Sequence, residues 1–184
     1  MSQKTVRKKP RLNRKFRFQL LAQWLNENHK PCRVADIGGG KGLLSYLLIN
    51  NGWDATVIDP FYQLLPYKYK DLLLGKRLLL TPEQIKSIKR ITEPFEIPMA
   101  KDFNLLIGLH AHGSNMKIIQ AAKKYGTDFI LLPCCVVDEP IIKQPGINWL
   151  ESLIEYAQSL GFKVKTDKLN FAGQRTLIYA FKDS

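Results

Sequence analysis

The chain has 184 residues, of which 45% are apolar and 24% charged, as expected for a single globular domain. No apolar run approaches the roughly 18 residues of a membrane-spanning helix, and the N-terminus lacks the apolar core of a secretory signal. Three cysteines, two of them adjacent, exclude a disulfide framework, so we expect a cytoplasmic protein with reduced thiols and no membrane association.

The formal net charge of +12 is concentrated at the N-terminus. Residues 1–17 contain eight basic side chains and no acidic one: Lys4, Arg7, Lys8, Lys9, Arg11, Arg14, Lys15 and Arg17. We therefore divide the chain into a basic arm, 1–17, and a domain, 18–184. Such an arm favours a polyanionic partner, with nucleic acid the first candidate, and a solvated tail that binds nothing is the alternative.

The first half of the chain predicts the start of a parallel sheet. Apolar residues at helical spacing predict a helix over 16–25, followed by a short strand over 32–37. A glycine loop, a helix over 43–48 and a second strand over 55–58 complete a β-loop-α-β unit.

The alternation of strands and helices resumes after a less clear stretch, 61–101. There, Thr81 to Gln84 has the pattern of a capping box, which predicts a short helix, and a strand follows near 88–92. The later elements are strands at 103–109 and 129–132, helices at 114–125 and 149–160, and an antiparallel pair of strands at 162–164 and 176–181. The prediction is an α/β, doubly wound, seven-stranded sheet, mostly parallel with an antiparallel edge strand.

The glycine loop at 38–42 does not fit two common nucleotide-binding patterns. The P-loop pattern requires a first glycine, where this chain has Ala35, and a Ser or Thr after the lysine, where it has Gly42. The dinucleotide-binding pattern requires a third glycine, where this chain has Leu43. The pattern that fits is Asp-x-Gly-x-Gly-x-Gly, formed by Asp36, Gly38, Gly40 and Gly42.

This pattern resembles motif I of the class I S-adenosylmethionine-dependent methyltransferases, and the resemblance covers about 33–181. It implies a Rossmann-like sheet and S-adenosyl-L-methionine as cofactor. Gly38, Gly40 and Gly42 would let the backbone approach the cofactor, Asp36 would accept from its amino group, and Asp59, after the second strand, would bind both ribose hydroxyls.

Three shorter pieces resemble one branch of that family, which includes tRNA 2′-O-methyltransferases. They are GKGLLS at 40–45, LHAHG at 109–113 and Pro133-Cys134-Cys135. The match departs at His112, where the branch has Cys, and no zinc-finger segment accompanies the domain, so the substrate does not carry over with the pattern.

The acceptor chemistry is expected at the end of the fourth main-sheet strand. No Asn/Asp-Pro-Pro-Tyr/Phe sequence follows it, which disfavours methylation of an exocyclic base amine. His110 is the candidate catalytic residue, as a general base for an oxygen or nitrogen nucleophile, and it is also expected to contact the cofactor; a purely pocket-shaping role is the alternative. We predict neither a cysteine nucleophile nor a metal site at His112, Cys134 and Cys135.

A second basic segment, 68–90, is interleaved with Tyr62, Tyr67 and Tyr69. Such a mixture suits RNA, through phosphate contacts and base stacking, and equally a solvated surface. The sequence therefore favours a methyltransferase acting on tRNA or rRNA. The alternatives are a small-molecule methyltransferase and a non-catalytic RNA-binding module of the same fold; the oligomeric state is left open.

Overall fold

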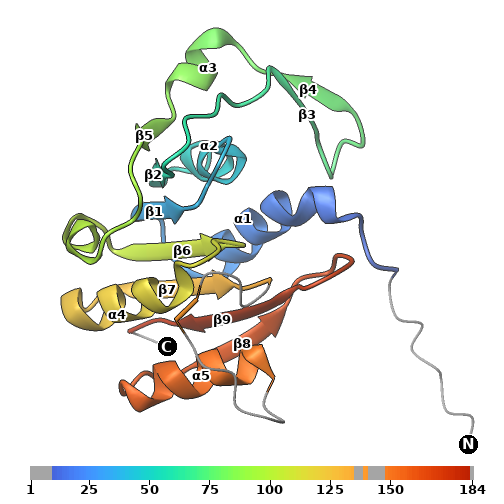
Figure 1. Ribbon diagram of the computed structural model, residues 1–184. Helices are drawn as coiled ribbons and strands as arrows, with labels where there is room; N and C mark the ends of the chain where they lie inside the picture. Colours follow the sequence, from blue (N-terminus) through green and yellow to red (C-terminus); the bar gives the residue numbers. More distant parts are fainter. Residues whose placement is uncertain (1–9, 135–138, 141–147, 183–184) are drawn as a thin grey trace, which may run out of the picture.

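A computed structural model describes residues 10–134, 139–140 and 148–182 (Figure 1). Its main sheet has seven strands in the order β5-β2-β1-β6-β7-β9-β8. Their bounds are β1 Arg33–Ile37, β2 Asp54–Ile58, β5 Lys89–Ile91, β6 Leu105–Leu109, β7 Asp128–Leu132, β8 Lys165–Lys168 and β9 Thr176–Ala180. The predicted seven-stranded α/β sheet is confirmed.

Five neighbouring strands are parallel, and β9 runs antiparallel to both β7 and β8. The strand predicted at 162–164 is wrong in position, because β8 begins three residues later. Phe162 instead packs edge-on against Phe129, with ring centroids 5.0 Å apart. The exposed, polar residues of β8 pair on one side only, as an edge strand permits.

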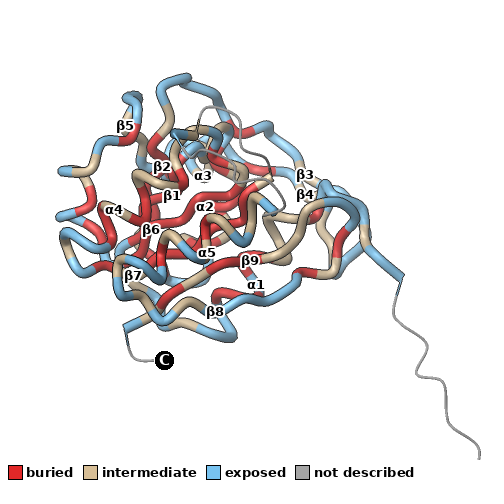
Figure 2. Tube along the Cα trace, turned by 60° about the horizontal axis from the view of Figure 1, so that its bottom comes forward, coloured by how far each residue is buried: buried red, intermediate tan, exposed pale blue. Residues whose placement is uncertain are grey.

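Helices cover both faces of this sheet (Figures 1 and 2). One face packs against α1 and α2, and the other against α4, α5 and the short 3₁₀ helix η2. The bounds are η1 Arg14–Phe16, α1 Arg17–Asn28, α2 Leu43–Ile49, α3 Pro82–Lys86, η2 Ile97–Asp102, α4 Asn115–Tyr125 and α5 Trp149–Ser159. No helix in the described ranges is long and apolar enough to cross a membrane.

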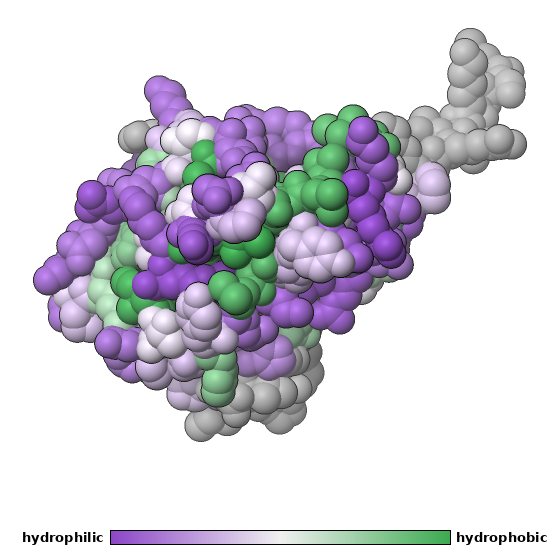
Figure 3. All heavy atoms as spheres, turned by 90° about the horizontal axis from the view of Figure 1, so that it is seen from above, coloured by the Kyte–Doolittle hydropathy of each residue, from purple (hydrophilic) through white to green (hydrophobic). Residues whose placement is uncertain are grey.

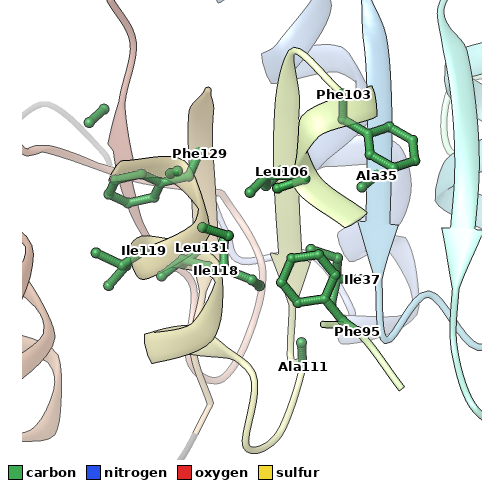
Figure 4. Close-up of a cluster of buried hydrophobic side chains, with 14 of the residues drawn as sticks. Ala35, Ile37, Phe95, Phe103, Leu106, Ala111, Ile118, Ile119, Phe129 and Leu131 are labelled. Carbon is green, nitrogen blue, oxygen red and sulfur yellow. The ribbon is translucent and has the colours of Figure 1, made fainter. Parts of the chain in front are cut away.

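The apolar core between the sheet and the helices α4, α5 and η2 extends to the edge of the sheet where the candidate site lies. Figure 4 shows Phe95 and Ala111 next to Ile37 at the end of β1, and all three are buried. The loops that follow β1 and β6 therefore pack against this core, which restricts the positions of their side chains.

A separate hairpin of β3 Lys68–Lys70 and β4 Arg77–Leu79 lies outside the main sheet and was not predicted. Its strands, Lys-Tyr-Lys and Arg-Leu-Leu, are only three residues long, which is too short for their alternation to predict a strand. Gln19 of α1 links the hairpin to the domain: its side-chain amide donates to the Lys70 carbonyl at 2.9 Å and accepts from the Leu72 N–H at 2.7 Å.

The order of the strands brings three chain segments to one edge. The chain leaves β1 for β2 on one side and returns to β6 on the other side, so β1 and β6 flank the point where the direction of winding changes. Ligands of open α/β sheets bind beyond the carboxyl ends of the strands at such a point. Asp36, Asp59 and His110 belong to the carboxyl ends of β1, β2 and β6 respectively.

Candidate active site

The glycine loop connects β1 to α2 with left-handed backbone at three positions. The φ angles are 66° at Gly38, 52° at Gly40 and 80° at Gly42. A Cβ added to Gly42 would lie 2.8 Å from a guanidinium nitrogen of Arg90 and 3.1 Å from Cγ2 of Val57, so a side chain here would displace Arg90 and crowd Val57. A Cβ on Gly40 would contact nothing closer than 3.8 Å, so the loop is open on that side.

Asp36 lies under the loop and is only 1% exposed. Its Oδ2 accepts a hydrogen bond of 2.9 Å from the hydroxyl of Ser45 in α2. Burial raises the pKa of Asp36 to about 6, although the hydrogen bond with Ser45 favours the ionised form. A cationic ligand would recover part of this desolvation cost, and Asp36 lines a cleft in which such a ligand fits.

Asp59 follows β2 and contacts the glycine loop directly. Its Oδ2 accepts from the backbone N–H of Gly40 at 2.9 Å, and its Oδ1 accepts from the N–H of Phe61, also at 2.9 Å. Each carboxylate oxygen has two lone pairs, so both oxygens still have capacity for a hydroxyl group. The side chain is thus held in one orientation with acceptors to spare.

Arg90 of β5 is a site residue that the sequence assigned only to a general basic segment. Its guanidinium donates to the carbonyl oxygens of Gly40 at 2.8 Å and Lys41 at 2.6 Å, and so braces the glycine loop. One feature of the sequence could have identified Arg90: it is a basic residue inside the strand predicted near 88–92, and it lies between the apolar residues Ile88 and Ile91. In a parallel sheet, an inward-facing cation needs acceptors.

Two adjoining clefts open beside the loop. The larger has a volume of about 460 Å³ and the second about 430 Å³, and both are lined by Gly38 and His110. Asp36 lines the larger cleft and Asp59 the second. The cleft volumes are in the usual range for small ligands, and an elongated ligand lying across Gly38 would meet both carboxylates.

His110 sits at the junction of the two clefts in an uncommon conformation. Its φ is 57°, and among the described residues outside glycine it has the one positive φ. Its backbone N–H donates to the Leu132 carbonyl at 3.1 Å, and within the described ranges neither ring nitrogen has a hydrogen-bond partner. Burial, followed by the nearby positive charges of Arg14 and Arg17, lowers its pKa to about 4, so the ring is neutral at neutral pH.

His112 and Cys134 lie together, as expected of neighbouring strand ends. The Nε2 of His112 is 3.2 Å from the Sγ of Cys134, and Cys135 is outside the described residues. In the part of the chain that the structure describes, no three His, Cys, Asp or Glu side chains form a group suited to a metal ion.

The described part of the basic arm is attached to the domain. Leu12 exchanges backbone hydrogen bonds with Asn170 and Ala172, at 3.1 Å and 2.9 Å, and Phe16 is buried. Arg17, the first residue of α1, lines the larger cleft. The arm's described end therefore belongs spatially to the site.

The second basic segment separates into two kinds of residue. Lys89 forms an ion pair with Asp54 at 2.6 Å, while Arg90 braces the loop. The part around the β3–β4 hairpin is exposed, with the Lys68 ammonium 4.8 Å from the centre of the Tyr67 ring. Figure 3 shows apolar and strongly hydrophilic side chains side by side on this face.

No family model matches the chain. A curated Caenorhabditis elegans protein named "Probable tRNA (uracil-O(2)-)-methyltransferase" is 28% identical over 162 residues. The match covers 80% of this chain and 27% of the relative, so the chain spans about a quarter of the length of the protein that it resembles.

Solved structures resemble most of the chain at low sequence identity. A ribosomal protein L11 methylase from Lactobacillus delbrueckii subsp. bulgaricus matches with a TM-score of 0.57 and 14% identity, over 94% of this chain and 81% of its own. A glycopeptide N-methyltransferase complexed with S-adenosyl-L-homocysteine matches with a TM-score of 0.55 and 11% identity, over 95% of this chain and 93% of its own. The chain therefore has the class I S-adenosylmethionine-dependent methyltransferase fold.

Proposed function

We propose that this chain is an S-adenosylmethionine-dependent methyltransferase that acts on RNA. The observation that carries the proposal is the junction of two clefts at Gly38 and His110, with one carboxylate in each cleft. This is the arrangement that an extended ligand with a cationic end and a diol requires. The fold and the methyltransferase names of the similar proteins support the same activity.

The residues present fit this cofactor. The bare backbone at Gly40 permits close approach, Asp36 is a buried acceptor suited to the ammonium of a methionine group, and Asp59 is a fixed acceptor suited to ribose hydroxyls. When bound, the cofactor supplies a methyl group attached to a positively charged sulfur. The sulfur is a good leaving group because it departs as a neutral thioether.

In this proposal, the chain's own contribution to catalysis is positioning and proton transfer. His110 holds a neutral imidazole, without a hydrogen-bond partner in the described ranges, where the two clefts meet. It would accept the proton of the attacking group as the bond from carbon to sulfur breaks and the new bond to carbon forms. We assign the acceptor as an oxygen atom, because the curated relative is named as an O-methyltransferase.

RNA is the proposed substrate because cationic and aromatic side chains surround the clefts. Lys68 lines the larger cleft, and the exposed rings of Phe61, Tyr62 and Tyr67 lie in the adjoining segment. Exposed rings stack with unpaired bases, while lysines contact phosphates. The basic residues of the N-terminal arm add to this charge, and the relative's name includes tRNA.

The test is methyl transfer from radiolabelled S-adenosylmethionine to total tRNA, total rRNA and a protein-free small-molecule extract, followed by digestion to nucleosides. We expect label in one RNA fraction, on one nucleoside. Label in the small-molecule extract alone would instead establish the small-molecule methyltransferase. RNA binding without binding of S-adenosylhomocysteine by calorimetry would establish the non-catalytic module.

A further inference from the structure

Arg17 is a half-buried cation in the described part of the chain that has no carboxylate partner there. The ion pairs among the described residues do not include it. Its guanidinium lies over the Phe18 ring, 4.2 Å from the centroid, and its one hydrogen bond to a described residue is long, 3.4 Å to the Arg14 carbonyl. Its Nε is buried without a partner in the described ranges.

This environment is unfavourable for a guanidinium unless an anion completes it. Burial, and then the charge of Arg14, lower the pKa of Arg17 from its usual value, which shows that the charged form is penalised. A guanidinium carries five N–H donors in a planar fork, and among residues 10–134, 139–140 and 148–182 only the long bond to Arg14 uses one of them. The fork matches an oxyanion with two equivalent oxygens.

The same cleft is lined by one buried acid, Asp36. An ammonium next to Asp36 and a carboxylate next to Arg17 are together the two charges of an α-amino acid. We propose that Arg17 binds the carboxylate of the cofactor's methionine group, while Asp36 binds its ammonium. This inference rests on the proposed function and removes one cation from the set that the sequence assigned to RNA.

An oxyanion has a second source at this site, since a phosphate of RNA offers the same pair of oxygens. The two sources are separated by comparing S-adenosylhomocysteine with 5′-methylthioadenosine, which has the adenosine and sulfur but no amino acid group. Calorimetry would measure both ligands with the wild type, Arg17→Gln, Arg17→Lys and the control Arg11→Gln. Arg11 is an exposed arginine of the same arm.

We expect Arg17→Gln to weaken S-adenosylhomocysteine about tenfold or more and to change 5′-methylthioadenosine by less than about twofold. Arg17→Lys, which keeps the charge and loses the fork, should lose less, and Arg11→Gln should match the wild type. Circular dichroism melts would establish that each variant is folded.

Three results would overturn the inference. Equal weakening of both ligands by Arg17→Gln would mean that Arg17 only shapes the pocket. Unchanged S-adenosylhomocysteine affinity with weakened binding of tRNA would assign the oxyanion to a phosphate. Absence of S-adenosylhomocysteine binding by the wild type would reject the proposed function itself, and the inference with it.

Discussion

The backbone N–H of Gly40 donates a 2.9 Å hydrogen bond to Oδ2 of Asp59. The motif glycine and the acid after the second strand are nineteen positions apart in the sequence, and each was predicted separately to meet the cofactor. Their direct contact gives the carboxylate one structural role and leaves room for the proposed one. It accepts from the glycine loop, and its remaining acceptor capacity is what the proposed ribose contact would use.

Asp59→Ala should therefore weaken S-adenosylhomocysteine binding by about 1.5–3 kcal/mol, because hydrogen bonds to a charged acceptor are lost. The loss should show in calorimetry without a change of fold by circular dichroism. Glu155→Ala removes an exposed acid from α5 and is the matched control, with unchanged affinity expected. Equal affinity for Asp59→Ala and the wild type would contradict the ribose role.

Asp36→Asn should stabilise the protein at neutral pH and impair ligand binding. The folded-state pKa of about 6 lies above the ordinary value, so the ionised carboxylate is the disfavoured form in the fold. The stability that Asp36 contributes is complete below about pH 4 and is lost as pH rises through about 6. The neutral amide keeps an acceptor for Ser45 and avoids that loss.

Urea unfolding at several pH values would measure this effect. The variant should be more stable than the wild type by about 1–3 kcal/mol near pH 8, and the difference should vanish near pH 4. Binding should have the opposite dependence: wild-type affinity for S-adenosylhomocysteine falls as pH decreases below about 6, since protonated Asp36 cannot pair with an ammonium. A pH-independent stability difference would show that the buried charge is not its cause.

Arg90→Met should loosen the glycine loop, because the carbonyl oxygens of Gly40 and Lys41 lose their donor. We expect about tenfold weaker S-adenosylhomocysteine binding, consistent with roughly 1–1.5 kcal/mol for the lost hydrogen bonds. Lys89→Met is the control, since it removes the same charge from the adjacent residue, whose partner is Asp54. If both variants weaken binding equally, net charge rather than the loop contact is responsible.

The predictability of this site from sequence follows from how local each feature is. The glycine loop, α2 and β2 form one contiguous unit, so a local pattern and its resemblance to motif I singled out Asp36, the three glycines and Asp59, and the structure brings these residues together at two adjoining clefts. Arg90 and Arg17 could not be identified in this way, because their roles depend on which strand pairs with β2 and on where α1 begins relative to the cleft. Neither fact is local in the sequence.

The same reasoning explains the errors in the fold. The capping box at Thr81 is a local pattern, and the structure contains it as predicted. The stretch 162–164 alternates apolar and polar residues like a strand, but it pairs with no strand; its partly buried Phe162 and Val164 pack against the core, with Phe162 edge-on to Phe129. The β3–β4 hairpin is bonded to α1 through Gln19, about fifty residues away in the sequence, and its three-residue strands give no local signal of comparable strength.

Deleting residues 1–9 should reduce the salt dependence of RNA binding. This segment contains four of the arm's cations, Lys4, Arg7, Lys8 and Lys9, and the deletion leaves intact the contacts of Leu12 and the buried Phe16. If these cations contact phosphates, the slope of log K against log salt should become shallower by up to about 3. An unchanged slope would identify the segment as a solubilising tail.

His110→Asn separates a catalytic role from a structural one. Asn adopts positive φ more readily than most residues, so the variant preserves the backbone at φ 57°, whereas Ala would add strain there. If His110 takes the proton of the acceptor, the rate of methyl transfer should fall about a hundredfold while S-adenosylhomocysteine affinity changes by less than about twofold. Because the pKa of His110 is lowered to about 4, the imidazole is already unprotonated above that value, and the wild-type rate should be flat between about pH 6 and 8 and decline only in acid.

Single-turnover kinetics with the RNA identified by radiolabelling would measure the rate of methyl transfer and its pH dependence, and calorimetry would measure the affinity. An Asn variant with full rate across neutral pH would remove His110 from the mechanism, and a parallel fall of rate and affinity would leave it as a residue that shapes the pocket.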